Sequence, residues 1–231
     1  MRRLPQRFLS LLALVSAEVL LLGGVFFGCL LLFAFVANTV FLEEDTALDQ
    51  ALFRFAATHT SPTVTRLMRI ISFFASVDYL VVVPALVVLV LSFFRDLRWY
   101  GLKILLISFG SSVLNQLMKR LFDRPRPDVA MLEQSGMSFP SGHAMIGGSF
   151  YGLLIYIVWR TVSNPYRRWG LTIALTVLLL LIGYSRIYLR VHYATDVLAG
   201  YALGLLWLII SIYLMRRLEK LYVKRYERRQ G

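Results

Sequence analysis

The chain has 231 residues, of which 58% are hydrophobic and 16% are charged. Soluble domains average about 45–50% apolar and about 25% charged residues, so this composition argues against a soluble fold. The formal net charge is +12, and because so apolar a chain has little polar surface, we expect anionic lipid rather than nucleic acid as its partner. The single cysteine, Cys29, lies in an apolar run. This excludes an intrachain disulfide and a cysteine-based metal site, and we expect Cys29 to pack as a small hydrophobe.

Six apolar runs are candidates for membrane-spanning helices. The basic N-terminus, followed by apolar residues from Phe8, imitates a secretory signal, but the apolar stretch continues to Leu42 with only Glu18 as an interruption, so we predict an uncleaved anchor. The fourth and fifth runs are shorter than the roughly 20 residues that cross a bilayer. Polar residues at their ends would therefore lie near or slightly below the headgroup level. The runs occupy residues 19–42, 70–94, 99–118, 144–159, 169–184 and 197–215.

Basic residues decide the sidedness of these six spans, which place both termini on one side of the membrane. The N-terminus, the loops after the second and fourth spans and the C-terminal tail all carry Arg or Lys and all fall on one face. The positive-inside rule makes this face cytoplasmic. The acidic turn at 43–45 and the loops at 119–143 and 186–196 then face outward.

A short helix is predicted between the first and second spans. Leu48, Leu52 and Phe55 recur at helical spacing with Asp49 and Arg54 off that stripe, which suggests a helix lying in the outer interface. Ser61 and the proline after it then resemble a cap and first turn. The predicted fold class is therefore all-α: an integral membrane bundle of six transmembrane helices with a short interfacial helix on the outer face.

Charged residues next to span ends are informative because a membrane-embedded chain tolerates charge only where it is paired or functional. The first cluster, residues 119–127, contains Lys119 and Arg126 at a point where prolines end a helix. Dense cations on a rigid turn suit an anion with several oxygens. A basic loop that touches lipid headgroups is the alternative for this cluster alone.

The second cluster immediately precedes the fourth span. Pro140 fixes the entry, Ser141 supplies a hydroxyl, Gly142 lets a ligand approach the backbone, and His143 is placed as a proton donor. The N–H groups of the new helix favour a phosphate. Taken alone, this stretch could also be a capped helix start with an incidental histidine.

The third cluster combines Ser185 and Arg186 with His192 and Asp196. His192 and Asp196 are four residues apart, so they share one helix face if the sixth span begins near His192. Asp196 could then hold one ring nitrogen and leave the other free as a nucleophile. Arg186 adds a third cation to the outer face.

Together the three clusters resemble the signature of the type 2 phosphatidic acid phosphatase family, which also includes the vanadium haloperoxidases. No position departs from the pattern, which covers residues 119–196, about a third of the chain. The six-span layout resembles the membrane branch of this family. The matching residues are Lys119, then after six residues Arg126-Pro127; Pro140-Ser141-Gly142-His143; and Ser185-Arg186, then after five residues His192, then after three residues Asp196.

The resemblance implies phosphoryl transfer to histidine without a metal or a cofactor. His192 would attack phosphorus, His143 would protonate the departing oxygen and then activate water, and Asp196 would orient His192. The phosphate oxygens would be bound by Lys119, Arg126, Ser141, Gly142 and Arg186. The motif gives no role to Arg120, Arg124 or Arg190. For Arg124 we expect a solvated or lipid-facing side chain, with contact to the lipid headgroup as the alternative. The turn at 43–45 is expected to be solvated.

The implied activity is that of an integral membrane lipid phosphatase acting on the outer face of the plasma (inner) membrane. The short form resembles bacterial phosphatidylglycerophosphate phosphatases, which also hydrolyse undecaprenyl diphosphate and phosphatidic acid; a lipid A phosphatase of the same family is the alternative. A transporter or non-enzymatic lipid-phosphate binder is disfavoured because the charges gather at one surface. We expect residues 1–231 to form a single phosphatase domain whose basic tail, 216–231, binds anionic headgroups on the cytoplasmic side. The headgroup and the oligomeric state are left open.

Overall fold

The computed structural model describes residues 17–94 and 97–227, and all regular secondary structure in these residues is helical. The all-α membrane fold predicted from the sequence is therefore confirmed. The expected N-terminal cations, Arg95 and the last four residues lie outside the described part of the chain. The helices are α2 (Ala17–Phe41), α3 (Ala47–Thr58), α4 (Pro62–Phe73), α5 (Val77–Ser92), α6 (Arg98–Phe122), α7 (Gly142–Thr161), α8 (Pro165–Tyr188) and α9 (Ala194–Glu227).

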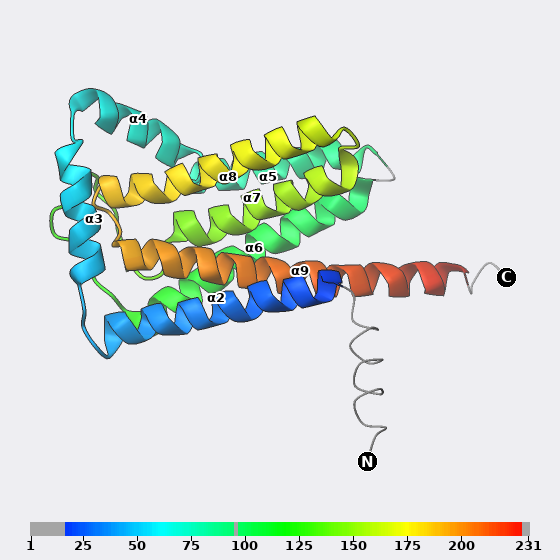
Figure 1. Cartoon of the computed structure of the whole chain (residues 1–231). Helices are drawn as coiled ribbons and strands as arrows, with labels where there is room; N and C mark the ends of the chain where they lie inside the picture. Colours follow the sequence, from blue (N-terminus) through cyan, green and yellow to red (C-terminus); the bar gives the residue numbers. More distant parts are fainter. Residues whose placement is uncertain (1–16, 95–96, 228–231) are drawn as a thin grey trace, which may run out of the picture.

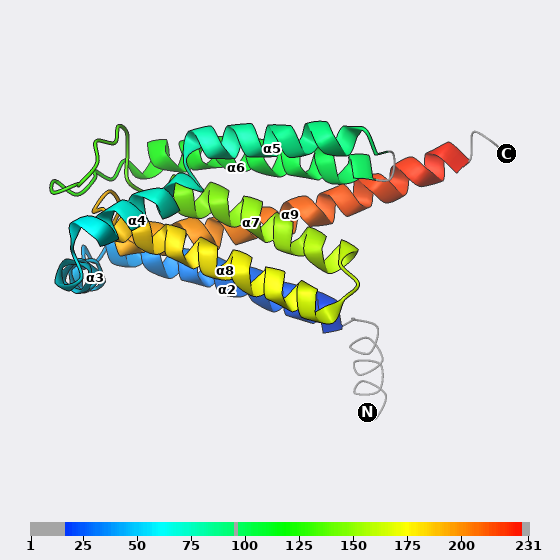
Figure 2. The same ribbon diagram turned by 90° about the horizontal axis from the view of Figure 1, so that it is seen from above.

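Six helices, α2 and α5 to α9, run side by side along a common direction (Figures 1 and 2). Five helices in the described residues are long and apolar enough to cross a membrane, or six spans if the bent pair α4–α5 counts as one. The fourth and fifth runs were predicted to be short, and this was wrong. Their helices, α7 and α8, have 20 and 24 residues, which at about 1.5 Å per residue suffices for a bilayer about 30 Å thick.

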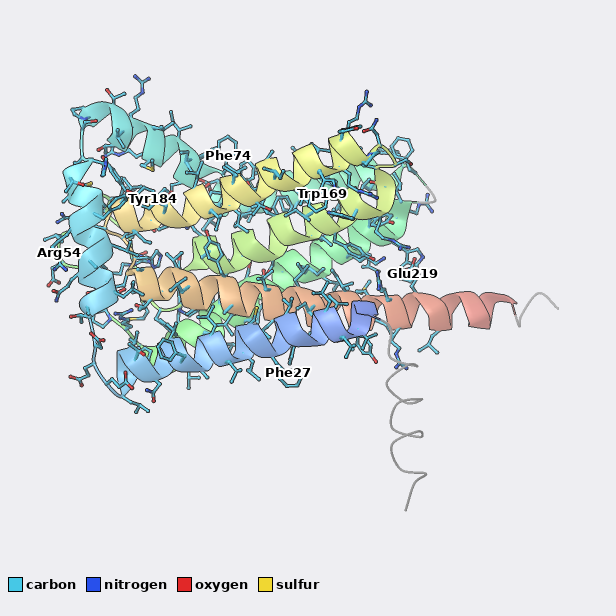
Figure 3. All side chains as sticks on the ribbon, in the orientation of Figure 1. Phe27, Arg54, Phe74, Trp169, Tyr184 and Glu219 are labelled. Carbon is cyan, nitrogen blue, oxygen red and sulfur yellow. The ribbon has the colours of Figure 1, made fainter. Side chains whose placement is uncertain are left out.

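The outer surface of the bundle is apolar. Phe27, labelled on α2 in Figure 3, has an exposed fraction of 62%, and Leu21, Leu31 and Phe35 on the same helix are comparably exposed. Exposed apolar side chains on this scale would be a liability in water, but they are the expected surface for contact with lipid. The packing thus agrees with a multi-span membrane protein.

The second span is broken at residues 74–76, where the axes of α4 and α5 differ by 42°. Ser61 caps α4 by accepting a hydrogen bond from the backbone N–H of Val64 at 3.2 Å, which confirms the predicted cap. Ser76 caps α5. At the break, the Tyr151 hydroxyl donates to the carbonyl oxygen of Phe74 at 2.7 Å, so a backbone acceptor freed by the bend is satisfied inside the bundle.

Close packing of α7 on α9 brings two of the sequence motifs together. A Cβ atom added to Gly200 would lie 2.8 Å from the carbonyl oxygen of Ser141, and one added to Gly204 would lie 2.5 Å from the carbonyl oxygen of Met145. Only glycine permits these backbones to approach so closely. The approach places the start of α7 directly against the start of α9.

The predicted interfacial helix is present as α3, which lies across the ends of the other helices (Figure 1). Its apolar residues Leu48 and Phe55 are exposed, while Asp49 and Ala56 are each only 1% exposed. Helix α3 therefore turns Leu48 and Phe55 outward and one carboxylate inward, while Leu52, the third residue of the predicted stripe, packs against a buried apolar cluster; the amphipathic pattern did not indicate this arrangement.

The opposite end of the bundle contains aromatic and basic residues. The rings of Trp159 and Trp169 lie 5.1 Å apart, and the Arg168 guanidinium lies 4.5 Å above the Trp159 ring. Lys103 forms a 3.0 Å ion pair with Glu219. Beyond this pair, α9 continues past the bundle (Figures 1 and 2).

Candidate active site

The three sequence clusters meet at one end of the bundle, beside α3. A pocket of about 450 Å³ is lined there by Lys119, Arg126, Gly142, His143 and His192, among other residues. Arg186 lies next to this pocket, because its Nη2 donates to the side chain of Gln134, a lining residue, at 3.3 Å. Arg126 and His192, which are 66 positions apart in the sequence, thus line the same cavity and lie within hydrogen-bond distance of each other.

The end of α6 positions the first cluster. Lys119 lies in the last turn of α6, which ends where Asp123 adopts a left-handed conformation with φ 45°. Arg126 is fixed by two loops, since Nε donates to the carbonyl of Gly136 at 2.9 Å and Nη1 donates to that of Val191 at 2.8 Å. Burial lowers the pKa of Arg126 below its ordinary value, an effect that Asp196 partly offsets, and the side chain remains a cation at neutral pH.

The start of α7 positions the second cluster. The backbone N–H of Ser141 donates to the carbonyl of Asp196 at 3.0 Å, and the Asn115 amide donates to the carbonyl of Pro140 at 3.2 Å. A Cβ on Gly142 would lie 3.1 Å from Asn115 Oδ1, so this position suits glycine. The Ser141 hydroxyl is buried and has no hydrogen-bond partner among the described residues.

Arg186, from the end of α8, is almost fully buried. Its Nη1 donates to the Ser72 hydroxyl of α4 at 2.6 Å, while its Nε has no partner within the described residues. Buried donors are normally satisfied. The unsatisfied atoms of Ser141 and Arg186 are therefore suited to a ligand that offers several acceptor oxygens.

His192 lies between the cations and a carboxylate. Its Nε2 is 3.3 Å from Arg126 Nη1, and its Nδ1 is 3.4 Å from Asp196 Oδ2 and 3.4 Å from the Ser138 hydroxyl. A guanidinium group can only donate, so Nε2 accepts and the ring proton belongs on Nδ1. Helix α9 begins two residues after His192, at Ala194, so His192 precedes the helix rather than lying in its first turn.

The environment keeps the His192 ring neutral. Burial lowers its pKa to about 4; the positive charges of Arg186 and Arg126 act in the same direction, and the Asp196 carboxylate opposes them. At pH 7 the ring therefore has an unprotonated lone pair on Nε2. A neutral imidazole is the form that can act as a nucleophile.

Asp196 is bound by more donors than the sequence predicted. It accepts hydrogen bonds from the Ser138 hydroxyl, from the Tyr193 backbone N–H at 2.9 Å and from Arg124 Nη1 at 2.6 Å. The expectation that Arg124 is solvated or lipid-facing was wrong: its side chain is 10% exposed and also forms an ion pair with Asp49. The structure orders Arg124 because two carboxylates face it.

Several residues at this site lie outside the motifs and were missed. Ser138 precedes its motif by two residues, and Asn115 lies one helical turn before Lys119. Asp49 gave the one available signal, since it is the only acidic residue on the short helix α3. Within residues 17–94 and 97–227, no group of three or more His, Cys, Asp or Glu side chains is arranged to hold a metal ion, and the acidic residues at 43–45 are exposed.

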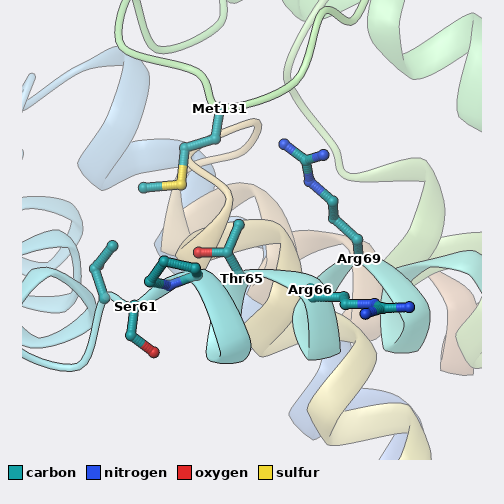
Figure 4. A pocket seen from close by; sticks show the side chains of 7 residues that line it. Ser61, Thr65, Arg66, Arg69 and Met131 are labelled. Carbon is teal, nitrogen blue, oxygen red and sulfur yellow. The ribbon is translucent and has the colours of Figure 1, made fainter.

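A second hollow, of about 530 Å³, lies beside the start of α4 (Figure 4). Arg66, Arg69 and Met131 contribute to its lining, together with hydroxyl-bearing residues. None of the described lining residues is a histidine or a carboxylate, so this hollow offers no nucleophile or proton carrier of the kind found beside His192.

Comparisons with known proteins agree with this geometry. A model of the PAP2 superfamily matches residues 100–220. The chain is 31% identical over 179 residues to phosphatidylglycerophosphatase B of Bacillus subtilis (strain 168), which covers 76% of this chain and 87% of that protein. It is 27% identical to an undecaprenyl-diphosphatase of Sulfolobus acidocaldarius over 70% of this chain and 76% of that protein.

The fold is shared with a solved structure. The crystal structure of the first transmembrane PAP2-type phosphatidylglycerolphosphate phosphatase, from Bacillus subtilis, superposes with a TM-score of 0.74 at 28% sequence identity, covering 84% of this chain and 96% of that one. The family match spans more than half of the sequence, and it includes all three motif clusters. The chain therefore belongs to the PAP2 superfamily.

Proposed function

We propose that this protein is an integral membrane lipid phosphatase that hydrolyses the phosphate monoester or diphosphate of a lipid, and that residues 1–231 form a single domain for this purpose. The observation that carries the proposal is a pocket with two chemistries. Lys119, Arg126 and the two histidines lie at one wall, and Val77 and Val81 of α5 lie at another. A molecule with a phosphate head and a hydrocarbon tail matches both walls.

The pocket also opens toward lipid. Val77 and Val81 line it and yet are 76% and 63% exposed, so the apolar wall continues onto the outer surface of the bundle. A lipid tail could leave the pocket there without crossing a polar layer. This geometry favours a substrate drawn from the bilayer.

The cations and unsatisfied donors support binding of the phosphoryl group by Lys119, Arg126, Ser141, Gly142 and Arg186. Arginine offers a planar fork of donors for oxygen atoms, and the first N–H groups of a helix attract anions. The start of α7 at Gly142 faces the same pocket. Together these groups can stabilise the charge on the equatorial oxygens of a phosphoryl transition state.

In the proposed reaction, Nε2 of His192 forms a bond to phosphorus while the bond from phosphorus to the lipid oxygen breaks. His143 donates a proton to that departing oxygen. His143 then accepts a proton from water, the water oxygen bonds to phosphorus, and the phosphorus–nitrogen bond breaks to release phosphate. Asp196 holds the Nδ1 side of the His192 ring, from 3.4 Å, so that Nε2 faces the phosphate.

Candidate substrates are phosphatidylglycerophosphate and undecaprenyl diphosphate, in keeping with the names of the relatives above, and phosphatidic acid, which the resemblance of the motifs implies. The test is phosphate release by purified protein from each of these lipids and from lipid A in mixed micelles, with His192→Ala as the control. We expect release from at least one lipid and none with the variant. Binding of the lipids without release by the wild-type protein would refute the proposal.

We further propose that the protein lies in the plasma membrane with its termini cytoplasmic and its site outside. Helix α2 begins, and α9 continues, at the end of the bundle opposite to the pocket (Figure 1), where Arg98, Arg160 and Arg168 also lie. In a Cys29→Ala background, a cysteine at exposed Ser135 should react with a membrane-impermeant maleimide in spheroplasts, and one at exposed Ser163 should not. Labelling at Ser163 alone would reverse the orientation.

A further inference from the structure

Two buried carboxylates from distant parts of the chain share one guanidinium group beside the site. Arg124 Nη2 lies 2.9 Å from Asp49 Oδ2, and Arg124 Nη1 lies 2.6 Å from Asp196 Oδ1. The exposed fractions of the two aspartate side chains are 1% and 0%. Charges are buried in this way only when they are paired, because each one loses its hydration.

Arg124 is itself fixed by contacts besides the two aspartates. Its Nη1 also donates to the Thr195 hydroxyl at 2.8 Å, and its guanidinium lies 4.0 Å above the ring of Tyr193. Asp49 completes the arrangement, since its Oδ1 accepts a hydrogen bond from the backbone N–H of Thr195 at 2.9 Å. One carboxylate on α3 thus binds both Arg124 and the first turn of α9.

The consequence for Asp196 is a fixed carboxylate plane. Its Oδ1 is committed to Arg124, while its Oδ2 accepts from the backbone N–H of Tyr193 at 2.9 Å and from the Ser138 hydroxyl. Donors on both oxygens prevent the carboxylate from rotating. The edge that faces His192 is therefore set partly by Ser138, which also lies 3.4 Å from the ring, and partly by Arg124, which acts from the far side of the carboxylate in the manner of outer partners that orient metal-bound histidines.

We propose that Arg124 and Asp49 are positioning residues that fix Asp196 against His192. Through Asp49, the outer helix α3 then contributes to the geometry of the active site. The inference rests on the proposed function. Neither Arg124 nor Asp49 is among the described residues that line the pocket. Both therefore act through Asp196 rather than on the substrate.

The test compares Arg124→Ala and Asp49→Asn with Arg120→Ala, which removes an exposed cation from the same segment. Each variant is purified in detergent, checked by size exclusion, and assayed for hydrolysis of dioctanoyl phosphatidic acid. We expect kcat to fall about 10- to 100-fold for Arg124→Ala and Asp49→Asn, as for other outer partners, with KM within about threefold of wild type. Arg120→Ala should retain wild-type kcat.

Asp49→Asn keeps the shape of the side chain and decides the question if Arg124→Ala does not fold. Its effect should vanish in an Asp196→Asn background, because residues that act through one another are not additive. A purely structural role for Asp49 would instead lower the double variant by the same factor as the single one, and that result would overturn the inference.

His192→Ala separates this inference from the proposed function. If His192→Ala is inactive and Asp49→Asn has wild-type kcat, only the positioning role is refuted. If His192→Ala hydrolyses the substrate normally, the proposed function itself is refuted.

Discussion

Replacing Gly200 with alanine should disturb the site by pushing the start of α7 away from α9. The new Cβ would lie 2.8 Å from both the Ser141 carbonyl oxygen and the Ala144 Cβ, and 3.2 Å from the Met145 backbone nitrogen. These neighbours are backbone or short side-chain atoms of α7 and cannot rotate away. Restoring an ordinary separation of 3.4 Å requires α7 and α9 to move apart by about 0.6 Å.

The magnitude follows from two opposing terms. Overpacking a well-packed interface costs about 1–3 kcal/mol, while alanine in a helix is favoured over glycine by about 0.8–1.0 kcal/mol. A net loss of about 1 kcal/mol should lower Tm by about 2–4 °C for a chain of this size. Because α7 supplies His143 and α9 follows His192, a shift of this size should also lower kcat about tenfold, given that misplacement by about 1 Å can cost about 100-fold.

The assay is a thermal unfolding curve and a kcat measurement on detergent-purified protein. Gly28→Ala is the matched control, because a Cβ there meets no atom within 4 Å among the described residues; it should keep kcat and equal or exceed the wild-type Tm. Wild-type Tm and kcat for Gly200→Ala would refute the view that glycine is required for the contact between α7 and α9.

Three further predictions concern the chemistry. His192→Ala should abolish turnover, whereas Asp196→Asn should retain weak activity, reduced about 100- to 10,000-fold from wild type, because the nucleophile is present but misoriented. Equal activity of the two variants in a phosphate-release assay would contradict these roles. Vanadate should inhibit as a mimic of five-coordinate phosphorus, and activity should survive EDTA; a strict Mg²⁺ requirement would indicate another mechanism. The pKa of His192 is lowered to about 4, so the neutral form of its ring persists below pH 6.5. We therefore expect kcat/KM for p-nitrophenyl phosphate, after correction for the ionisation of the substrate, to fall with decreasing pH only near pH 4. Loss of half the corrected rate near pH 6.5 would show an unshifted histidine.

The membrane spans were predictable because hydrophobic length alone determines whether a helix can cross a bilayer. The break at 74–76 was not, since Phe74 and Ala75 are as apolar as their neighbours and the bend is stabilised by Tyr151, a residue more than 70 positions away. The short lengths assigned to α7 and α8 had a different cause. Their ends are polar where they approach the site and the interface, so apolar content underestimates helix length there.

The motif residues of the candidate site were predictable as a set because their spacing is visible in the sequence. Arg124 was misjudged because the sequence does not show that Asp49 lies opposite. Asp49 is 75 residues away from Arg124, and only the fold of α3 across the bundle end brings the two together. Ser138 was missed for a similar reason, since a serine near a loop proline carries no signal until Asp196 is placed beside it.

The apolar wall at Val77 and Val81 determines which part of the substrate the enzyme has to recognise. With the hydrocarbon left in the bilayer, the length of the chain need not match the depth of the pocket, so two-chain glycerolipids and long polyprenyl chains present the same reacting end. The relevant concentration is then the number of substrate molecules per unit of membrane area. Turnover should consequently respond to dilution of the substrate by inert lipid within the membrane, even when the amount of substrate per volume of sample is unchanged.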